Sequence, residues 1–329
     1  LYYIDSGQLP QESFNPGLSG LNINENRIFF QWIKLGEEYK LFLKLEGSKH
    51  ELTSESITIT GVNDLKSIFE YSMDSMQKVE QWKVSNQALK RSGGRWLPVR
   101  LSSNFVAFIF RNLCLLEGII LPLPVERQFD RASTILLAQR ESITLKEIIK
   151  KMLYKSTNVT AEIIGLFSAS IWGRRVNGLK ESASLMNGWF NNVYGENNSI
   201  LANHSGLTTE TRVSALDFTS FLSMPENMIQ LPGILRKVKF NNKDEKVLRK
   251  SNVEVFAKTG TMYYNRGLAG YICRNGEPVA TFSIFVADIN KKNDAVRRKV
   301  FHPPDSKVWL RKARRQEKLL LAHWSKLYA

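Results

Sequence analysis

The sequence has 329 residues, 43% of them hydrophobic, and is long enough for two domains with buried cores. Its apolar runs, such as FVAFIF, are broken by polar residues well before the roughly 18 residues that a membrane-spanning helix needs, which excludes an integral membrane span. The formal net charge of +15 raises polyanions as partners, namely nucleic acid, anionic lipid or other acidic polymers.

The chain starts at Leu1, and neither an initiator Met nor a signal sequence precedes LYYIDSGQLP. We therefore expect part of the protein to lie upstream. The two cysteines, Cys114 in a helix-like run and Cys273 in a strand-like run, allow one disulfide. Two buried free thiols are the expectation.

Short strand-like segments with alternating apolar residues fill residues 24–84. They are RIFFQWIKL, YKLFLKLEG, SITITGV and VEQWKVS. Paired glycines and a proline then interrupt the pattern at KRSGGRWLPVR. We place a domain boundary there, with a small β-rich accessory domain at residues 1–97 and a second domain at residues 98–329.

The next elements are a helix in NFVAFIFRNLCLLEG and a strand in IILPLPV. After the polar stretch AQRESITL, Thr144 and Glu147 form a capping box that starts a helix. A further helix is expected from about Thr160. Between these two helices lies the polar triplet Ser156-Thr157-Asn158, an arrangement that can hold short polar side chains at the mouth of a cleft.

Three strand-like segments, VEVFAKTG, GLAGYIC and VATFSIFVAD, dominate the C-terminal part of the chain. Asn275-Gly276 forms a two-residue turn, so the strands that it joins must be antiparallel. The predicted fold class is therefore α+β, an antiparallel sheet packed with helices, plus the β-rich domain at the N-terminal end.

The basic charge is densest in the tail that starts at Lys291. Its cations include Arg297, Arg298, Lys299, Arg311, Lys312, Arg314 and Arg315. Apolar residues recur among them, namely Trp309, Leu310, Ala313, Leu319, Leu320 and Trp324. This pattern predicts a final amphipathic helix that docks on a core and exposes a basic face. A nucleic-acid or membrane arm is the alternative, but no zinc-ligand spacing, phosphate-binding loop or RNA-binding motif supports it.

Lys258 is a lone cation in the strand-like stretch FAKTGTM, where Thr259, Gly260 and Thr261 follow it. A lysine can simply protect an edge strand, just as the polar triplet can simply cap a helix. An ammonium with two neighbouring hydroxyls also binds a carboxylate by charge-assisted hydrogen bonds. Gly260 has no side chain to obstruct a substrate that lies along the strand. From these residues alone, the structural and the carboxylate-binding interpretations both stay open.

Three motifs in chain order resemble the penicillin-recognising serine D-Ala-D-Ala peptidases. They are the triplet within MLYKSTNVTAE, the segment NHSGLT at residues 203–208, and AKTGTM followed by GLAGYI. The closer resemblance is to the low-molecular-mass class C branch, the D-alanyl-D-alanine carboxypeptidase/endopeptidase family, and it covers residues 98–329. The β-rich front end and GGRWLPVR resemble the domain that this branch inserts into its catalytic domain.

The resemblance implies a role for each motif residue. Ser156 relays a proton toward the leaving amine, and Asn158 binds the substrate amide. Lys258, with the hydroxyls of Thr259 and Thr261, binds the terminal carboxylate of the substrate. The backbone N–H of Thr261 forms half of an oxyanion hole.

Two features of the family are altered or missing. Asn203 and His204 stand where an aspartate and a glycine are more usual, and His204 is expected to be a polar loop residue rather than a catalytic group. The family's nucleophile is the serine of an S-x-x-K motif. Its one match before the triplet, Ser75-Met76-Gln77-Lys78, is polar and leads into a strand instead of opening an apolar helix. We expect a fragment whose nucleophile lies upstream, and the 329-residue chain by itself to form no acyl-enzyme.

The resemblance therefore implies a serine-type D-Ala-D-Ala carboxypeptidase/endopeptidase that acts on peptidoglycan stem peptides and needs no metal or nucleotide cofactor. Its complete form is expected in the periplasm, and β-lactams are expected ligands because they mimic those peptides. The alternative is a catalytically inactive module that binds cell-wall peptides or β-lactams. A basic nucleic-acid-binding protein is a third candidate.

Overall fold

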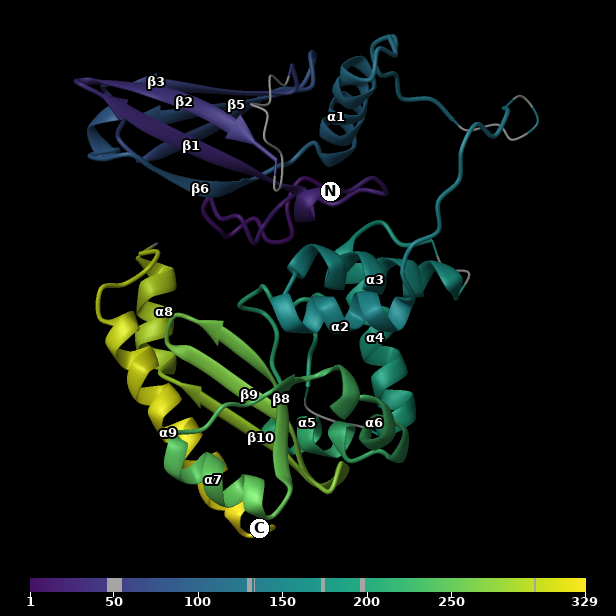
Figure 1. The fold of residues 1–329 in the computed structure, drawn as a ribbon, viewed down its shortest axis with the longest axis vertical. Coiled ribbons are helices and arrows are strands. Elements are labelled where there is room, and N and C mark those ends of the chain that lie inside the picture. The colour runs from purple at the N-terminus through teal and green to yellow at the C-terminus, as the bar shows by residue number, and fades with distance from the viewer. Residues whose placement is uncertain (46–54, 129–131, 133, 173–174, 196–198, 299) are drawn as a thin grey trace. The chain divides into compact units, whose positions relative to one another are not determined.

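The computed structural model describes residues 1–45, 55–128, 132, 134–172, 175–195, 199–298 and 300–329, and Figure 1 labels most of their helices and strands. The chain forms two compact units, each discontinuous in sequence. The first unit contains Leu1–Glu141, Thr157–Ser184 and Ala202–Thr209, and the second contains Ser142–Ser156, Leu185–Leu201 and Glu210–Ala329. The domain boundary expected after residue 97 stays a prediction.

One sheet of the first unit is centred on β1 (Arg27–Leu35), which pairs antiparallel with β2 (Glu38–Lys44) and β6 (Gly93–Pro98). The sequence pattern predicts β1 and β2, although residues 46 and 47 of the second segment lie outside the described residues. It does not predict β6, because paired glycines are typical of turns. Here the absence of a side chain is needed, since a Cβ on Gly94 would lie 2.5 Å from the Phe29 ring.

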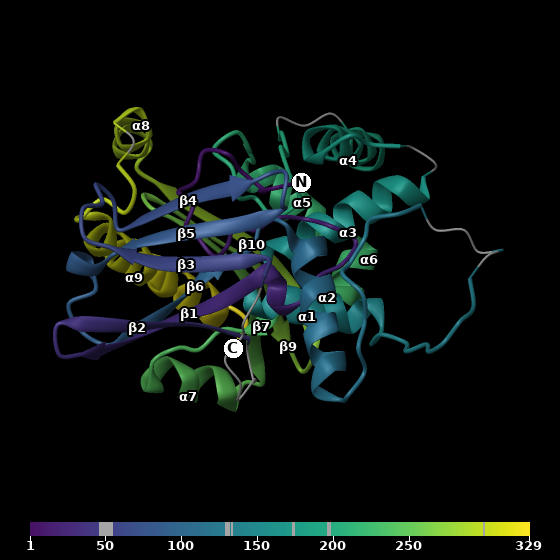
Figure 2. The same ribbon diagram turned by 90° about the horizontal axis from the view of Figure 1, so that it is seen from above.

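A second sheet of the first unit is centred on β5 (Val79–Ser85), and Figure 2 shows its three strands side by side. β3 (Ile57–Val62) runs parallel to β5, and β4 (Phe69–Asp74) runs antiparallel to it. The predictions of β3 and β5 are confirmed. β4 is missing from the predicted strands because its sequence, FEYSMD, is polar and short.

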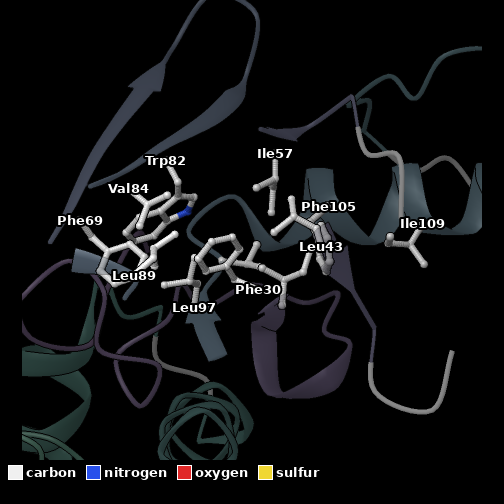
Figure 3. Packing of buried hydrophobic residues seen from close by; sticks show 12 residues of the cluster. Phe30, Leu43, Ile57, Phe69, Trp82, Val84, Leu89, Leu97, Phe105 and Ile109 are labelled. Atoms are coloured by element: carbon white, nitrogen blue, oxygen red, sulfur yellow. The ribbon is translucent and has the colours of Figure 1, made fainter. Parts of the chain in front are cut away.

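Buried side chains of both sheets and of α1 (Ser102–Leu116) form one core, drawn in Figure 3. Phe30 of β1 and Trp82 of β5 are 0% and 1% exposed. Phe69 meets the rings of both edge-on, with centroid distances of 6.1 and 6.4 Å. Phe105 of α1 is fully buried in the same cluster. The alternation along β1 and β5 therefore turns one face of each sheet toward this core.

Glu80 of β5 is a buried carboxylate that accepts hydrogen bonds from the backbone N–H groups of Arg100 and Leu101, at 2.9 and 2.8 Å. Burial raises the pKa of Glu80 to about 7, and these two hydrogen bonds oppose the rise because they favour the charged form. A raised folded-state pKa means that the folded chain binds the proton more tightly than the unfolded chain. The resulting stability is complete below pH 4.5 and is lost as the pH rises through about 7.

Replacing Glu80 by glutamine, which cannot ionise, is expected to remove this contribution to the pH dependence. We expect the free energy of unfolding of the unaltered chain to fall between pH 4.5 and about 7, relative to Glu80→Gln. Urea denaturation across that range measures the difference. Glu70→Gln, an exposed carboxylate of β4, is the control and should follow the unaltered chain. Parallel curves for the unaltered chain and Glu80→Gln contradict the prediction.

The helix predicted at residues 104–118 is confirmed as α1, but the strand predicted after it in IILPLPV is wrong. Residues 119–125 have no regular secondary structure. Pro122 and Pro124 lack the backbone N–H that a strand contributes to a sheet. Most of the apolar side chains of this segment are solvent-exposed, with Ile120 at 84% and Leu123 at 60%.

The helical part of the first unit is built on α3 (Asn158–Ile171), which begins at Asn158 rather than near Thr160. Val159 packs with Ile4, Leu18 and Leu207, so three separate stretches of sequence meet in one apolar cluster. The remaining elements here are η1 (Asn24–Asn26), η2 (Asn86–Ala88) and the first residues of α4 (Leu179–Tyr194), which ends in the second unit.

The second unit starts with α2 (Leu145–Lys155), and its predicted capping box is confirmed. The backbone N–H of Glu147 donates to Thr144 Oγ1 at 3.3 Å, and the backbone N–H of Thr144 donates to the Glu147 carboxylate at 3.1 Å. These bonds satisfy donors that every helix leaves free in its first turn. The start of α2 is therefore fixed by local sequence.

A four-stranded antiparallel sheet in the order β10-β9-β8-β7 forms the core of the second unit. Its strands are β7 (Arg236–Lys237), β8 (Val253–Met262), β9 (Asn265–Arg274) and β10 (Glu277–Ala287). Asn275 and Gly276 have φ of +53° and +89°, as the predicted two-residue turn requires. The antiparallel hairpin and the α+β fold class are confirmed.

Helices cover the two faces of this sheet. On one face Leu321 of α9 (Ser306–Lys326) packs with Val255, and Figure 1 shows α9 along the strands. On the other face Tyr271 packs against Leu222 of α5 (Ala215–Leu222). The remaining elements of the unit are α6 (Pro225–Gln230), η4 (Pro232–Ile234), α7 (Asn242–Lys250) and α8 (Ile289–Arg297).

The amphipathic basic helix predicted at the C-terminus is confirmed as α9. Two residues assigned to its apolar face, Leu319 and Leu320, are instead 60% and 44% exposed, and Leu321 is the buried one. Lys299 of the basic tail lies outside the described residues. No helix in the described part of the chain is both long and apolar enough to cross a membrane.

Both cysteines are free thiols. Cys273 in β9 is fully buried, as predicted, whereas Cys114 in α1 is only half-buried.

Candidate active site

Lys258 lies near the end of β8, where the strand emerges from the core. Val253, Val255 and Ala257 are buried, whereas Thr259 and the two residues after it are exposed. The Lys258 ammonium donates hydrogen bonds to Ser156 Oγ at 2.5 Å and to the backbone carbonyl of Thr259 at 2.7 Å. The structure therefore brings together two of the predicted site residues that are 102 positions apart in sequence.

Ser156 is the residue that ends α2, and its backbone is left-handed, with φ of +56° and ψ of 51°. Its N–H closes the helix on the carbonyl of Met152. Glycine is the usual residue in this conformation, because a Cβ makes it cost roughly 1–2 kcal/mol. A serine at this position is a local backbone cost of the kind found at functional sites.

The surroundings of Lys258 lower the pKa of its ammonium. Burial lowers the pKa of Lys258, and the positive charge of Arg266 lowers it further. A desolvated lysine beside a second cation loses its proton more readily than an exposed one. The hydrogen bond from the Lys258 ammonium to Ser156 Oγ places these two groups within the distance that a proton transfer needs.

Thr259, Gly260 and Thr261 continue the exposed end of β8. A Cβ added to Gly260 would meet nothing within 4 Å, so the space beside this position is open. The Thr261 hydroxyl accepts a hydrogen bond of 2.6 Å from Nη1 of Arg266, its partner on β9. Sequence reasoning missed Arg266, because this arginine belongs to none of the motifs in the sequence.

Asn158, the third member of the polar triplet, belongs to the first unit as the first residue of α3. Its side-chain amide donates to the backbone carbonyl of Phe14 at 2.9 Å. This bond holds the amide in a defined position. Its part in binding a substrate stays a prediction.

The S-x-x-K match at Ser75 lies in the turn between β4 and β5, not on a helix. Met76 in this turn is 98% exposed, and Lys78 has a left-handed backbone. The Lys78 ammonium pairs with the Glu126 carboxylate at 2.8 Å, on the surface. The expectation that this segment lacks the helical context of the family's nucleophile is confirmed.

The NHSGLT segment is held by Glu162, a fully buried carboxylate of α3. Glu162 accepts hydrogen bonds from the backbone N–H of His204 at 3.0 Å and from the backbone N–H and hydroxyl of Ser205 at 2.9 and 2.5 Å. The His204 ring bonds to the Ser182 hydroxyl at 2.9 Å and packs so close to α3 that a Cβ on Gly165 would lie 2.1 Å from it.

Burial lowers the pKa of His204, although the nearby charge of Glu162 opposes this. Ser182 is 1% exposed, so the Ser182–His204 contact has no access to a substrate. These contacts describe His204 as an internal polar residue that fixes the segment. We find no catalytic role for it in this geometry.

A metal site is not formed by the part of the chain that the structure describes. No group of three or more His, Cys, Asp or Glu side chains in it has the geometry to hold an ion.

Two solved structures share this fold. Penicillin binding protein 4 of Haemophilus influenzae aligns with 87% of this chain and 65% of its own, with a TM-score of 0.62 and 20% sequence identity. The same protein complexed with a novel β-lactam aligns with 84% of this chain and 65% of its own, with a TM-score of 0.59 and 20% identity. The fold is therefore that of the penicillin-binding D-Ala-D-Ala peptidases, and this chain spans less than two-thirds of the length of those structures.

The model of the D-Ala-D-Ala carboxypeptidase 3 (S13) family matches residues 11–232, which is more than half of the chain. The chain belongs to this family of serine peptidases, and the resemblance inferred from the motifs is confirmed. The matched residues include Ser156 and Asn158 and end before Lys258. None of the curated proteins compared with the sequence matches it.

Proposed function

We propose that this chain supplies the substrate-binding half of a serine-type D-Ala-D-Ala carboxypeptidase/endopeptidase that acts on peptidoglycan stem peptides. One observation carries the proposal: the hydrogen bond between the Lys258 ammonium and Ser156 Oγ. A half-buried lysine that emerges beside an open glycine position and two exposed hydroxyls fits the terminal carboxylate of a peptide. Membership of the S13 family supports this substrate class.

The proposed roles follow from what each group offers. Lys258, Thr259 and Thr261 bind the carboxylate, while Gly260 leaves room for the peptide along β8. Ser156 exchanges a proton with Lys258 and passes it toward the leaving amine of the terminal D-Ala. The backbone N–H of Thr261 is a proposed donor to the oxyanion of the tetrahedral intermediate. Asn158 is the proposed ligand of the substrate amide.

The proposed place of action is outside the cytoplasm, in the periplasm, because that is where peptidoglycan peptides occur. β-Lactams are proposed ligands of the same site, since their carboxylate occupies the position of the peptide's carboxylate. The solved relative in complex with a β-lactam supports this choice. We propose no metal or nucleotide cofactor, and no nucleic acid as a partner.

The alternative function is binding without catalysis, and the surroundings of Ser75 favour it for these 329 residues. That serine is the only one with a lysine three positions later, and its lysine is engaged with Glu126 on an exposed turn. A nucleophile requires an adjacent base within hydrogen-bond reach. We propose that Ser75 is not acylated.

Binding of acetyl-L-Lys-D-Ala-D-Ala tests the proposed site, with calorimetry as the readout. We expect the peptide to bind and its L-Ala-L-Ala diastereomer to bind at least about tenfold more weakly, because misdirecting the carboxylate loses a charge-assisted hydrogen bond. Equal binding of the two peptides, or none, contradicts the proposal.

Labelling with a fluorescent penicillin then separates catalysis from binding. The expected result is reversible binding with no covalent band on a denaturing gel. A band that disappears in Ser75→Ala identifies Ser75 as a nucleophile and overturns our assignment of that turn.

A further inference from the structure

A nearly fully buried ion pair contacts Thr261, one of the residues of the proposed carboxylate site. Arg266 of β9 and Glu317 of α9 are 7% and 3% exposed. Their contact is bidentate, with Nε to Oε2 at 2.8 Å and Nη2 to Oε1 at 2.9 Å. Desolvation makes such a pair weak evidence for stability, and apolar residues often replace one without loss. Stability alone therefore does not explain the Arg266–Glu317 pair, and we expect a role beyond holding α9 on the sheet.

The third guanidinium nitrogen of Arg266 points to that role. Nη1 donates to the Thr261 hydroxyl at 2.6 Å, while Glu317 occupies the other side of the guanidinium. A guanidinium has only donors and keeps its charge, so Thr261 Oγ1 must be the acceptor in this bond. The hydroxyl's single hydrogen is then directed away from Arg266. Because Thr261 is exposed, that hydrogen is available to a ligand along β8.

The Arg266–Glu317 pair and Lys258 differ in net charge, so they can act on a ligand in different ways. Glu317 neutralises Arg266 at short range, and it is the one acidic residue of α9. The Lys258 ammonium donates to a hydroxyl and to a backbone carbonyl, neither of which carries a charge. Lys258 therefore supplies the unbalanced positive charge of the site. The Arg266–Glu317 pair has no net charge, and what it offers a ligand at Thr261 is the orientation of the hydroxyl.

We infer that the Arg266–Glu317 pair is a specificity device that holds the Thr261 hydroxyl as a fixed donor, so that the site selects a peptide with a free terminal carboxylate over one with a terminal amide. The inference rests on the proposed function. A carboxylate presents acceptors only, one to Lys258 and one to Thr261. A terminal amide presents one acceptor and one NH2 group, and that group faces a donor in one of the two positions. The pair thus favours carboxypeptidase substrates at this site.

Calorimetry with the full chain and two peptides tests the inference. The peptides are acetyl-L-Lys-D-Ala-D-Ala and its C-terminal amide, and the measured quantity is the ratio of their Kd values. The double substitution Arg266→Gln/Glu317→Gln removes both charges together, which avoids a lone buried ion. We expect it to reduce the preference for the acid by about tenfold, the value of one charge-assisted hydrogen bond.

Two substitutions at Thr261 keep the test independent of the buried pair. Thr261→Val removes the hydroxyl with little change of shape and should reduce the preference as much as the double substitution does. Thr261→Ser keeps the hydroxyl and should retain the preference. In a Thr261→Val background, the double substitution Arg266→Gln/Glu317→Gln should have no further effect on the ratio of Kd values, because the pair acts through the Thr261 hydroxyl.

Each outcome decides a different point. If Thr261→Val leaves the preference for the acid unchanged, or if the pair still alters it without that hydroxyl, the inference is overturned while the proposed function stands. If the unaltered chain binds neither peptide, the proposed function fails and the inference fails with it. A mere loss of stability lowers the active fraction for both peptides and leaves their Kd ratio unchanged.

Discussion

Replacing Lys258 by methionine is expected to weaken binding of acetyl-L-Lys-D-Ala-D-Ala by about 100-fold, because hydrogen bonds to a charged group contribute roughly 1.5–3 kcal/mol. Methionine keeps an unbranched side chain of similar length but carries no charge and no donor. Both burial and the charge of Arg266 disfavour the charged form of Lys258, so its loss should not lower stability. The expected result is lost affinity in calorimetry with a nearly unchanged melting temperature.

Lys237→Met is the matched control for this experiment. Lys237 lies on β7 of the same sheet and is paired with Glu254 at 2.7 Å, away from the open end of β8. It changes the net charge of the chain equally, so any loss from weaker long-range attraction appears in both variants. If Lys258→Met keeps full affinity for the peptide, Lys258 does not bind the carboxylate. The Lys258–Ser156 hydrogen bond then no longer supports the proposed function.

Replacing Phe30 by alanine is expected to lower the free energy of unfolding of the β-rich part by about 3–5 kcal/mol. Phe30 is 0% exposed and lies between Trp32 and Phe69, with ring centroids 5.1 and 6.1 Å away. Removal of its ring leaves a cavity that the two paired sheets cannot close without breaking strand hydrogen bonds. Amide hydrogen exchange of β1 and β5 measures the loss.

Leu35→Ala on the same strand is the control, because Leu35 is 58% exposed and its truncation removes little buried surface. Its protection should stay within about 0.5 kcal/mol of the unaltered chain. Similar losses in the two variants would mean that the alternation along β1 does not define the core.

Much of the fold follows from local sequence. The alternation in β1 and β5, the capping box at Thr144 and the Asn275-Gly276 turn each specify their own element, and the structure has all of them. β6 is not predicted, because the sequence pattern does not reveal that aromatic rings of β1 pack over the glycines of β6. The strand expected in IILPLPV fails for the opposite reason, since its apolar residues have the right period but its prolines cannot complete a ladder.

The candidate site was only half accessible from sequence. Lys258 and the polar triplet stand out as motifs, and their resemblance to a known family brought Ser156 and Lys258 together before the structure did. Arg266 and Glu317 carry no such signal. Glu317 lies 51 residues from its partner, on a helix whose sequence is typical of a solvated basic face. Hydrophobic periodicity indicates which face of a helix is buried, but it does not indicate which distant residue contacts that face.

The left-handed backbone of Ser156 has a practical consequence for anyone who selects robust versions of this protein. Glycine at that position would relieve the conformational cost and at the same time remove the hydroxyl that contacts Lys258. Stability therefore favours glycine at position 156, whereas the contact with Lys258 requires serine there. A screen that selects for heat resistance alone would enrich Ser156→Gly, the substitution that removes the hydroxyl in contact with Lys258.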